Sequence, residues 1–165
     1  MPGRRSAADA RASENFAFLS RTDAQLARLG ALAEWSLHVD PPTTIQKLRI
    51  FTEVLARFVA ARQGALPVPN EAFADLLVRL QRSRLLPDKA ADVCHHLRRL
   101  GNVAIHENKG TAAQALSCLK LARELGVWLY RTFTPDPNFS PSPFIPPEVR
   151  RDISAELAEQ VEARC

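Results

Sequence analysis

The residues of this sequence best suited to chemistry gather in one stretch, Cys94–Glu107, and they are histidines, arginines and an asparagine. An α-helix advances about 100° per residue, so four of them would lie within roughly 60° of one another on one helix. These four are His95, Arg99, Asn102 and His106. The apolar residues of the same stretch gather on the opposite side of the helix; they are Ala90, Val93, Leu97, Leu100 and Ala104. The spacing therefore predicts a polar stripe that faces away from the core side of its own helix.

An arginine and a histidine on one face are suited to recognising or cleaving a phosphodiester. Arginine offers a fixed fork of donors to phosphate oxygens, and histidine exchanges a proton near neutral pH. The alternative is a solvated helix face, but such a face normally prefers Lys, Glu and Gln, and the stripe has none of them. Gly101 lies mid-helix at a cost of about 1 kcal/mol relative to alanine, which predicts that another backbone approaches closely there.

Arg49 and Glu53 are a second pair of charged residues that interrupts an apolar helical pattern. They are four positions apart, so they can pair along their own helix. The alternative is that one of them supports the stripe on the later helix. The sequence leaves both interpretations open.

Length, charge and cysteine usage limit the classes of function. The 165 residues are enough for one domain with a sizeable core, and the net charge of +4 permits contact with nucleic acid without demonstrating it. The three cysteines form no CxxC pair, and His95 and His96 point about 100° apart, so neither a disulfide framework nor a metal site is predicted. The sequence contains no Gly-rich phosphate-binding loop, so no cofactor is predicted. No membrane span or signal region is recognisable, which predicts a cytoplasmic protein without membrane contact.

Helical spacing, broken by proline and glycine, predicts the elements that position the stripe. Five helices are expected, at about 23–38, 43–63, 70–83, 88–108 and 112–133. Thr43 or Thr44 would start the second, and Asn70 and Asp88 would cap the third and fourth. The connectors are short enough to make neighbouring helices antiparallel, and no pattern predicts a strand. The predicted fold class is all-α, an antiparallel helical bundle.

Composition divides the chain into four parts. Residues 1–14 are small, polar and charged, which is typical of a disordered tail, and residues 15–133 form the helical bundle domain. Residues 134–147 hold six prolines in fourteen positions, with three bulky apolar residues among them, which predicts an extended strap lying on the bundle. In residues 148–165, apolar residues recur every four positions, which is typical of the start of a coiled-coil-like helix.

Several motifs, in this order along the chain, together resemble a known family. They are Asn15–Leu19, Lys47–Glu53, Leu97–Glu107, Leu119–Arg123 and Phe144–Pro147. Arg99 and His106, with six residues between them, resemble the Arg/His signature of the HEPN superfamily. The wider pattern is similar to a helical domain of unknown function found near the N-terminus of type I restriction enzyme R subunits and related helicases. The resemblance covers roughly residues 15 to 147 and implies an antiparallel bundle that pairs through the stripe-bearing helix.

In catalytic HEPN proteins the matching arginine and histidine cut RNA without metal, and Asn102 matches a polar position seen in many members. Asn102 does not directly follow Arg99, however, as the polar residue does in the commonest form of the signature. Many members are also non-catalytic modules. The resemblance therefore leaves the activity open. The polar stripe and the mid-helix Gly101 suit the close approach of two identical helices, so we expect a homodimer with the stripe near its two-fold axis.

Two functional hypotheses follow. The first is a non-catalytic, dimerising or docking module of a restriction-type prokaryotic defence protein. It would face RNA, DNA or restriction-system subunits with five residues: His95, Arg98, Arg99, Asn102 and His106. The start of a coiled coil favours this hypothesis. The second is a metal-independent endoribonuclease, with an antitoxin-type partner, in which His106 is the general acid/base and Arg99 stabilises the phosphate's developing charge. The intact polar stripe favours the second.

Overall fold

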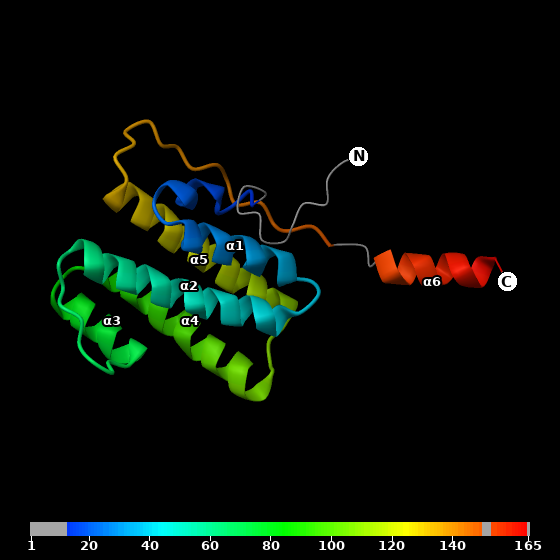
Figure 1. Ribbon diagram of the computed structural model, residues 1–165, viewed down its shortest axis with the longest axis horizontal. Coiled ribbons are helices and arrows are strands. Elements are labelled where there is room, and N and C mark those ends of the chain that lie inside the picture. The colour runs from blue at the N-terminus through cyan, green and yellow to red at the C-terminus, as the bar shows by residue number, and fades with distance from the viewer. Residues whose placement is uncertain (1–12, 150–152, 165) are drawn as a thin grey trace.

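A computed structural model describes residues 13–149 and 153–164 of the chain (Figure 1). These residues form six α-helices and one 3-10 helix, with no strand among them. The predicted all-α helical bundle is therefore confirmed. Residues 1–12, most of the expected tail, lie outside the described part of the chain.

The five helices expected between residues 23 and 133 are present. They are α1 (Ala24–Ser36), α2 (Pro41–Arg62), α3 (Phe73–Arg82), α4 (Asp88–Glu107) and α5 (Ala112–Phe133). Helix α2 is central, because it packs against the other four and shares its most extensive interface with α4. Figure 1 shows α2 crossing the front of the bundle between α1 and α4, with α5 behind. The polar residues of α4 are thus positioned mainly by α2.

Three helix starts differ from the prediction. Helix α2 begins at Pro41, because Asp40 caps it by accepting from the Thr43 N–H and a proline fits the first turn, where no N–H is needed. Asn70 does not cap α3, since it adopts φ 57° in the preceding turn and the helix begins at Phe73. Asp88 is the first residue of α4 rather than its cap, and its carboxylate accepts from Gln81 instead.

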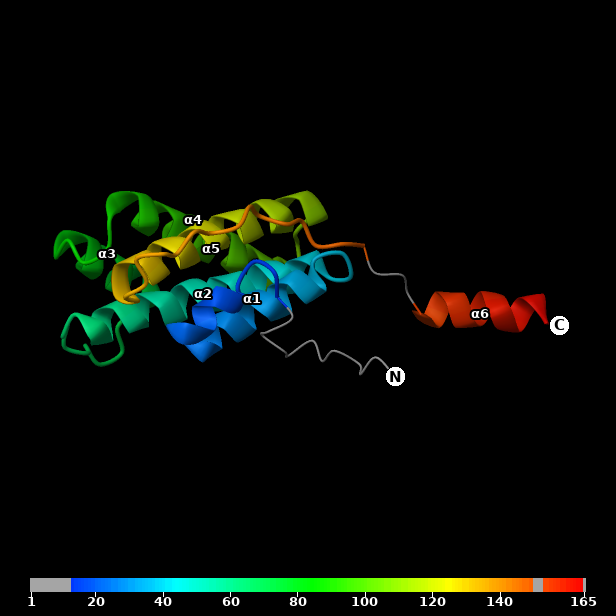
Figure 2. The ribbon, with the colours of Figure 1, turned by 90° about the horizontal axis from the view of Figure 1, so that it is seen from above.

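The Pro-rich segment after α5 lies on the bundle, as predicted. Figure 2 shows it running back along α5 towards the 3-10 helix at Ala17–Arg21. Phe139 anchors its first half, with ring centroids 4.2 Å from Tyr130 and 5.4 Å from Phe18. Further on, His38 Nε2 lies 2.9 Å from the Pro147 carbonyl oxygen. Aromatic packing and polar contacts together therefore hold the strap on the bundle.

Ser13, at the end of the predicted tail, is buried and bonded to α1. Its hydroxyl donates to the Glu34 carboxylate over 2.9 Å, and the Asn15 N–H donates to the same oxygen over 3.3 Å. Burial is the main cause that raises the pKa of Glu34 above its usual value, and these two hydrogen bonds oppose it. At the other end of the chain, α6 (Ile153–Ala163) lies apart from the bundle in Figure 1.

Candidate functional site

The buried side of α4 is rotated from the side that apolar spacing predicts. Val93 and Leu100, expected in the core, are only half-buried, whereas Cys94 and Gly101 are fully buried. The buried residues of α4 are Ala90, Ala91, Cys94, Leu97, Gly101 and Ala104. On a helical wheel this set is centred roughly 40° closer to the polar stripe than the predicted set. The expectation that the stripe faces away from the core therefore holds for Arg99 and His106, which are exposed, but not for His95 and Asn102, which lie half-buried at the edge of the core.

This rotation divides the predicted face into two lines. His95, Arg98 and Asn102 are half-buried, and we call them the inner line. Arg99 and His106 are exposed, and we call them the outer line. Residues three and four apart are neighbours on a helix surface, so the three side chains of the inner line follow one another along α4.

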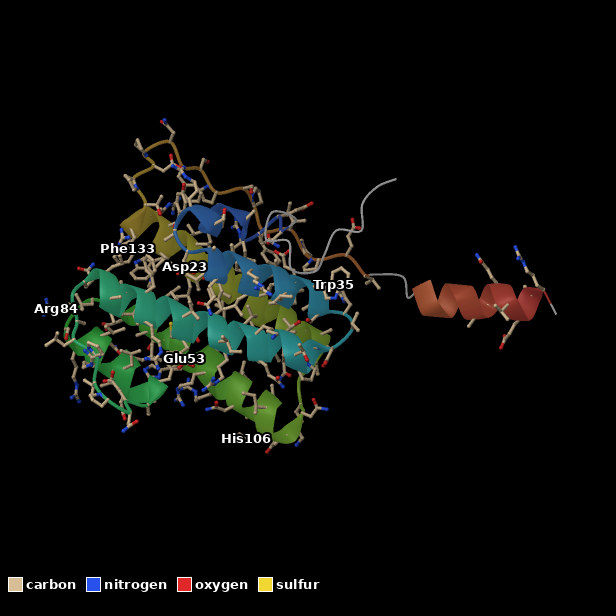
Figure 3. All side chains as sticks on the ribbon, in the orientation of Figure 1. Asp23, Trp35, Glu53, Arg84, His106 and Phe133 are labelled. Atoms are coloured by element: carbon tan, nitrogen blue, oxygen red, sulfur yellow. The ribbon has the colours of Figure 1, made fainter. Side chains whose placement is uncertain are left out.

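Arg49 connects α2 to the inner line. Its Nε–H donates to Asn102 Oδ1 over 2.9 Å, while its Nη1 lies 3.6 Å from Glu53 Oε2. The two interpretations that the sequence left open for Arg49 and Glu53 therefore hold together: the residues pair along α2, and Arg49 also contacts the stripe. Figure 3 shows Glu53 on the side of α2 that faces α4.

Gly101 is where the side chain of Arg49 passes α4. A Cβ atom at position 101 would lie 2.5 Å from Arg49 Cβ and 2.8 Å from Arg49 Cδ. One turn further along, the side-chain amide of Gln46 donates to the Ala104 carbonyl over 3.1 Å. The close neighbour predicted at Gly101 is thus a side chain of the same chain and not another backbone.

Positive charge exceeds negative charge at the boundary between α2 and α4. Glu53 accepts a 3.0 Å hydrogen bond from Arg57 as well as pairing with Arg49, so two arginines share one carboxylate. Arg98 and Arg99 have no carboxylate within ion-pair distance among the described residues. The Nε atom of Arg98 is buried and makes no hydrogen bond to the described part of the chain. An anion near this boundary would therefore meet uncompensated arginine charge.

His95 and His106 have different surroundings. Burial lowers the pKa of His95, and the neighbouring charges of Arg98 and Arg99 lower it further, which favours the neutral imidazole. His106 lies in the last turn of α4, exposed, and no described residue hydrogen-bonds to its imidazole (Figure 3). Arg99 is about 10 Å away along the helix axis. The described residues of a single chain therefore supply no group that orients His106 for proton transfer.

Two contacts at this boundary were not predicted from the sequence: the pair of Arg57 with Glu53, and the bond from Gln46 to Ala104. Arg57 follows Glu53 at the same spacing as Glu53 follows Arg49, so the i,i+4 rule alone would have found the pair. Gln46 offered no such signal, because its partner is a main-chain carbonyl on another helix.

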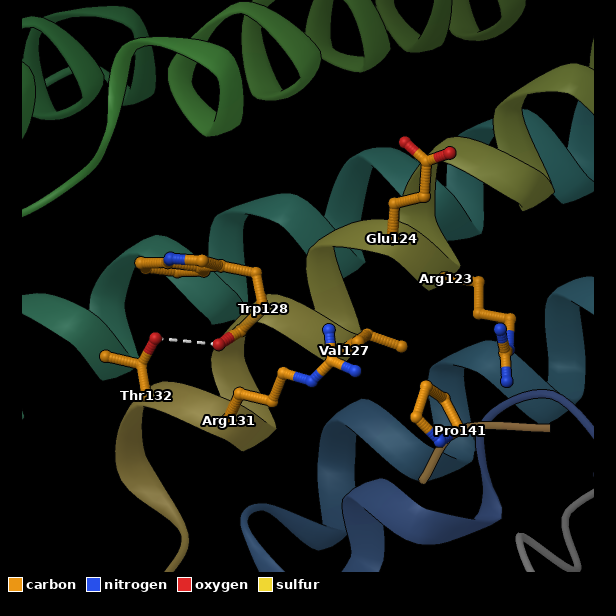
Figure 4. Close-up of a pocket in the computed structure, with 7 residues that line it drawn as sticks. All are labelled: Arg123, Glu124, Val127, Trp128, Arg131, Thr132 and Pro141. Carbon is orange, nitrogen blue, oxygen red and sulfur yellow. Dashed lines mark hydrogen bonds between the residues drawn. The ribbon is translucent and has the colours of Figure 1, made fainter. Parts of the chain in front are cut away.

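A pocket of about 470 Å³ opens elsewhere, between α5 and the strap. Figure 4 shows its lining side chains, among them Arg123, Trp128, Arg131 and Pro141. Its arginines are already engaged: Arg123 donates to the carbonyl oxygens of Asn15 and Ser142, and Arg131 lies over the Phe139 ring. The pocket therefore serves the attachment of the strap, and the α2–α4 boundary is the better candidate site.

The described residues hold neither a metal-binding cluster nor a membrane-spanning helix. No group of three His, Cys, Asp or Glu side chains in residues 13–149 and 153–164 is arranged to hold a metal ion. No helix in the same ranges is both long and apolar enough to cross a membrane.

Sequence similarity relates this chain to a much longer protein. It is 35% identical over 134 residues to the type I restriction enzyme EcoKI endonuclease subunit of Escherichia coli strain K12. The match covers 81% of this chain and 11% of that subunit, so the chain spans about a tenth of its relative's length. No protein-family profile matches the chain, and no solved structure does. The chain is therefore a helical domain related in sequence to part of a type I restriction endonuclease subunit.

Proposed function

We propose that the chain is a nucleic-acid-facing module of a restriction-system protein, and that it binds phosphate groups at the α2–α4 boundary without cleaving them. One observation carries the proposal: four arginines lie at or beside this boundary, against two carboxylates, Glu53 and Asp92. Glu53 is shared by Arg49 and Arg57, and Arg98 and Arg99 have no acidic partner among the described residues. Arginine charge that lacks a carboxylate attracts a polyanion, and neutralised phosphates release counterions.

The isolation of His106 supports binding rather than cleavage. A general acid/base acts from a held position, and its second ring nitrogen usually bonds a group that sets the tautomer. His106 has no such partner among the described residues, and Asn102, the other polar candidate, is already bonded to Arg49. The proposed module therefore gives Arg99, Asn102 and His106 no catalytic role.

The restriction-system context rests on the relative. Similarity to an endonuclease subunit supports a role beside other restriction-system subunits, which we propose as its protein partners. Because the chain spans 11% of that subunit, the activity of the whole subunit is not carried over.

Binding of a short fluorescein-labelled DNA duplex, followed by anisotropy across a salt series, tests the proposal. The wild-type chain should bind. Removing Arg98 and Arg99 together (R98A/R99A) should weaken binding and reduce the slope of log affinity against log salt by about one for each phosphate that is no longer neutralised. Arg28, exposed on α1, provides the control, and R28A should change neither quantity. No binding by the wild type, or an equal reduction in R28A, would contradict the proposal.

We further propose that the module forms a homodimer through α4. Val103 is 43% exposed and lies about 40° from Arg99 on the helical wheel, beside the outer line, where a second copy would cover it. Gly101 no longer supports this proposal, because Arg49 of the same chain fills the space beside it. Light scattering should give twice the chain mass at tens of micromolar. A monomer, with and without residues 148–165, would contradict the proposal.

A further inference from the structure

We infer that the phosphate contact at the α2–α4 boundary is an anion site made by Arg49, Arg98 and His95, and that the outer line, Arg99 and His106, lies outside it. The ligand class is a backbone phosphodiester of a nucleic acid. The inference rests on the proposed function and names the side chains that carry it.

Arg49 is held in place before any ligand arrives. Asn102 accepts from its Nε, Glu53 lies beside its Nη1, and the missing side chain at Gly101 leaves room for its methylene stem. The Arg49 side chain is still 24% exposed, and its Nη2 amino group has no partner among the described residues. An arginine whose rotamer is already fixed loses less entropy when it binds, so its free donors form a prepared phosphate contact.

Arg98 and His95 lie on the same side of α4 as the residue that holds Arg49. Arg98 is one turn before Asn102, and His95 is one turn before Arg98, so all three lie on one side of α4, half-buried at the edge of its packed surface. The Nε atom of Arg98 is shielded from water without a hydrogen-bond partner in the described chain. Charges act more strongly where water is excluded, so an anion beside Arg98 is stabilised more than one on the exposed outer line.

Glu53 is the carboxylate of α2 beside this site, and its charge is already shared. It pairs with Arg49 at 3.6 Å and with Arg57 at 3.0 Å, so these three residues together carry one net positive charge. On α4, Asp92 acts on His95 but is outnumbered by Arg98 and Arg99, so the boundary remains positive, and the lowered pKa of His95 favours an uncharged ring nitrogen. The site therefore suits a singly charged phosphodiester.

Replacing arginine with lysine separates the two lines. R49K keeps the charge and the methylene stem beside Gly101, but it removes both the Nε–H bonded to Asn102 and the fork. It should weaken binding of the labelled duplex roughly tenfold. The matched variant R99K makes the same change at an exposed arginine. Its affinity for the duplex should stay within about twofold of the wild-type value, because only the charge contributes there. The same variants are also tested with a single RNA strand of the same sequence, and comparing the two ligands distinguishes RNA from DNA. R49K should again bind more weakly than R99K.

A second variant keeps all charges unchanged. N102A removes the acceptor that positions Arg49, so affinity should fall several-fold while the salt slope stays that of the wild type, because the number of neutralised phosphates is unchanged. Thermal unfolding followed by circular dichroism checks that R49K, N102A and R99K remain folded at the assay temperature.

The outcomes separate this inference from the proposed function. Binding by the wild type with equal affinities for R49K and R99K, or a weaker affinity in R99K than in R49K, would overturn the inference alone. Absence of binding by the wild type would overturn the proposed function and the inference together.

Discussion

Asn15 and Ile145 lie 130 positions apart in the chain and are joined by two hydrogen bonds. The side-chain amide of Asn15 donates to the Ile145 carbonyl over 2.8 Å, and the Ile145 N–H donates to Asn15 Oδ1 over 2.9 Å. Arg123 of α5 bonds both segments, through the carbonyl oxygens of Asn15 and Ser142. The segment around Asn15, which precedes α1, therefore holds the strap that follows α5.

We expect N15A to destabilise the chain by about 1–3 kcal/mol, because two main-chain groups of the strap lose their partner. Urea unfolding measures this change. Ser20, whose hydroxyl donates to the Ala17 carbonyl at an exposed position, is the control, and S20A should cost less than about 0.5 kcal/mol. Equal unfolding midpoints for N15A and the wild type would show that the strap contributes nothing to stability.

We expect G101A to destabilise the chain by about 1–3 kcal/mol, because the new methyl group would overlap the stem of Arg49. Gly126, which is also buried within a helix, is the matched control. A Cβ there would meet only the end of the Leu19 side chain, at 3.0 Å, so G126A should cost less than G101A. Both variants gain the same helix propensity, so the difference in their unfolding free energies measures the contact with Arg49. The reverse order would contradict the packing.

Glu34 should make stability depend on pH in a definite direction. Its pKa is raised from 4.5 in the folded chain, mainly by burial, so the folded state holds its proton more tightly than the unfolded state. The free energy of unfolding should therefore fall as pH rises from 4.5 through the folded-state pKa. In E34Q, which keeps a side-chain acceptor for Ser13, this fall should be absent. Urea unfolding at a series of pH values measures it, and parallel curves for E34Q and the wild type would contradict it.

For the endoribonuclease alternative, we expect single-stranded RNA to remain intact when it is incubated with folded chain in EDTA. Nothing in the described part of the chain orients His106, and Asn102 is bonded to Arg49. The opposite result would be cleavage that leaves 2′,3′-cyclic phosphates and spares DNA. If H106A and R99A then slowed cleavage by about 10²-fold or more while H96A slowed it little, the proposal of a binding module would have to be abandoned.

Local sequence patterns were enough to predict the elements of this chain. Apolar spacing and a Thr111–Gln114 capping box define α5, which spans Ala112–Phe133 as predicted. Gly64 adopts φ 68° just after α2, and a glycine after an apolar helical pattern is a local signal for the end of a helix. Such signals act over one or two turns, so they can be read without knowing the neighbours of a helix. A predicted cap was wrong where the side chain bonds elsewhere. Asp88, for example, bonds to Gln81 instead of the N-terminus of its own helix.

The sequence by itself determined that α4 is a helix and that His95, Arg99, Asn102 and His106 share one side of it. Only the tertiary structure decided which arc of α4 is buried, because a helical wheel gives angles between residues and not the direction from which α2 approaches. Cys94 and Gly101 became part of the core through that approach, and Asn102 came to lie at its edge, where Arg49 holds it. A glycine and an arginine far apart in the sequence carry no joint signal, since their complementarity exists only once two helices pack.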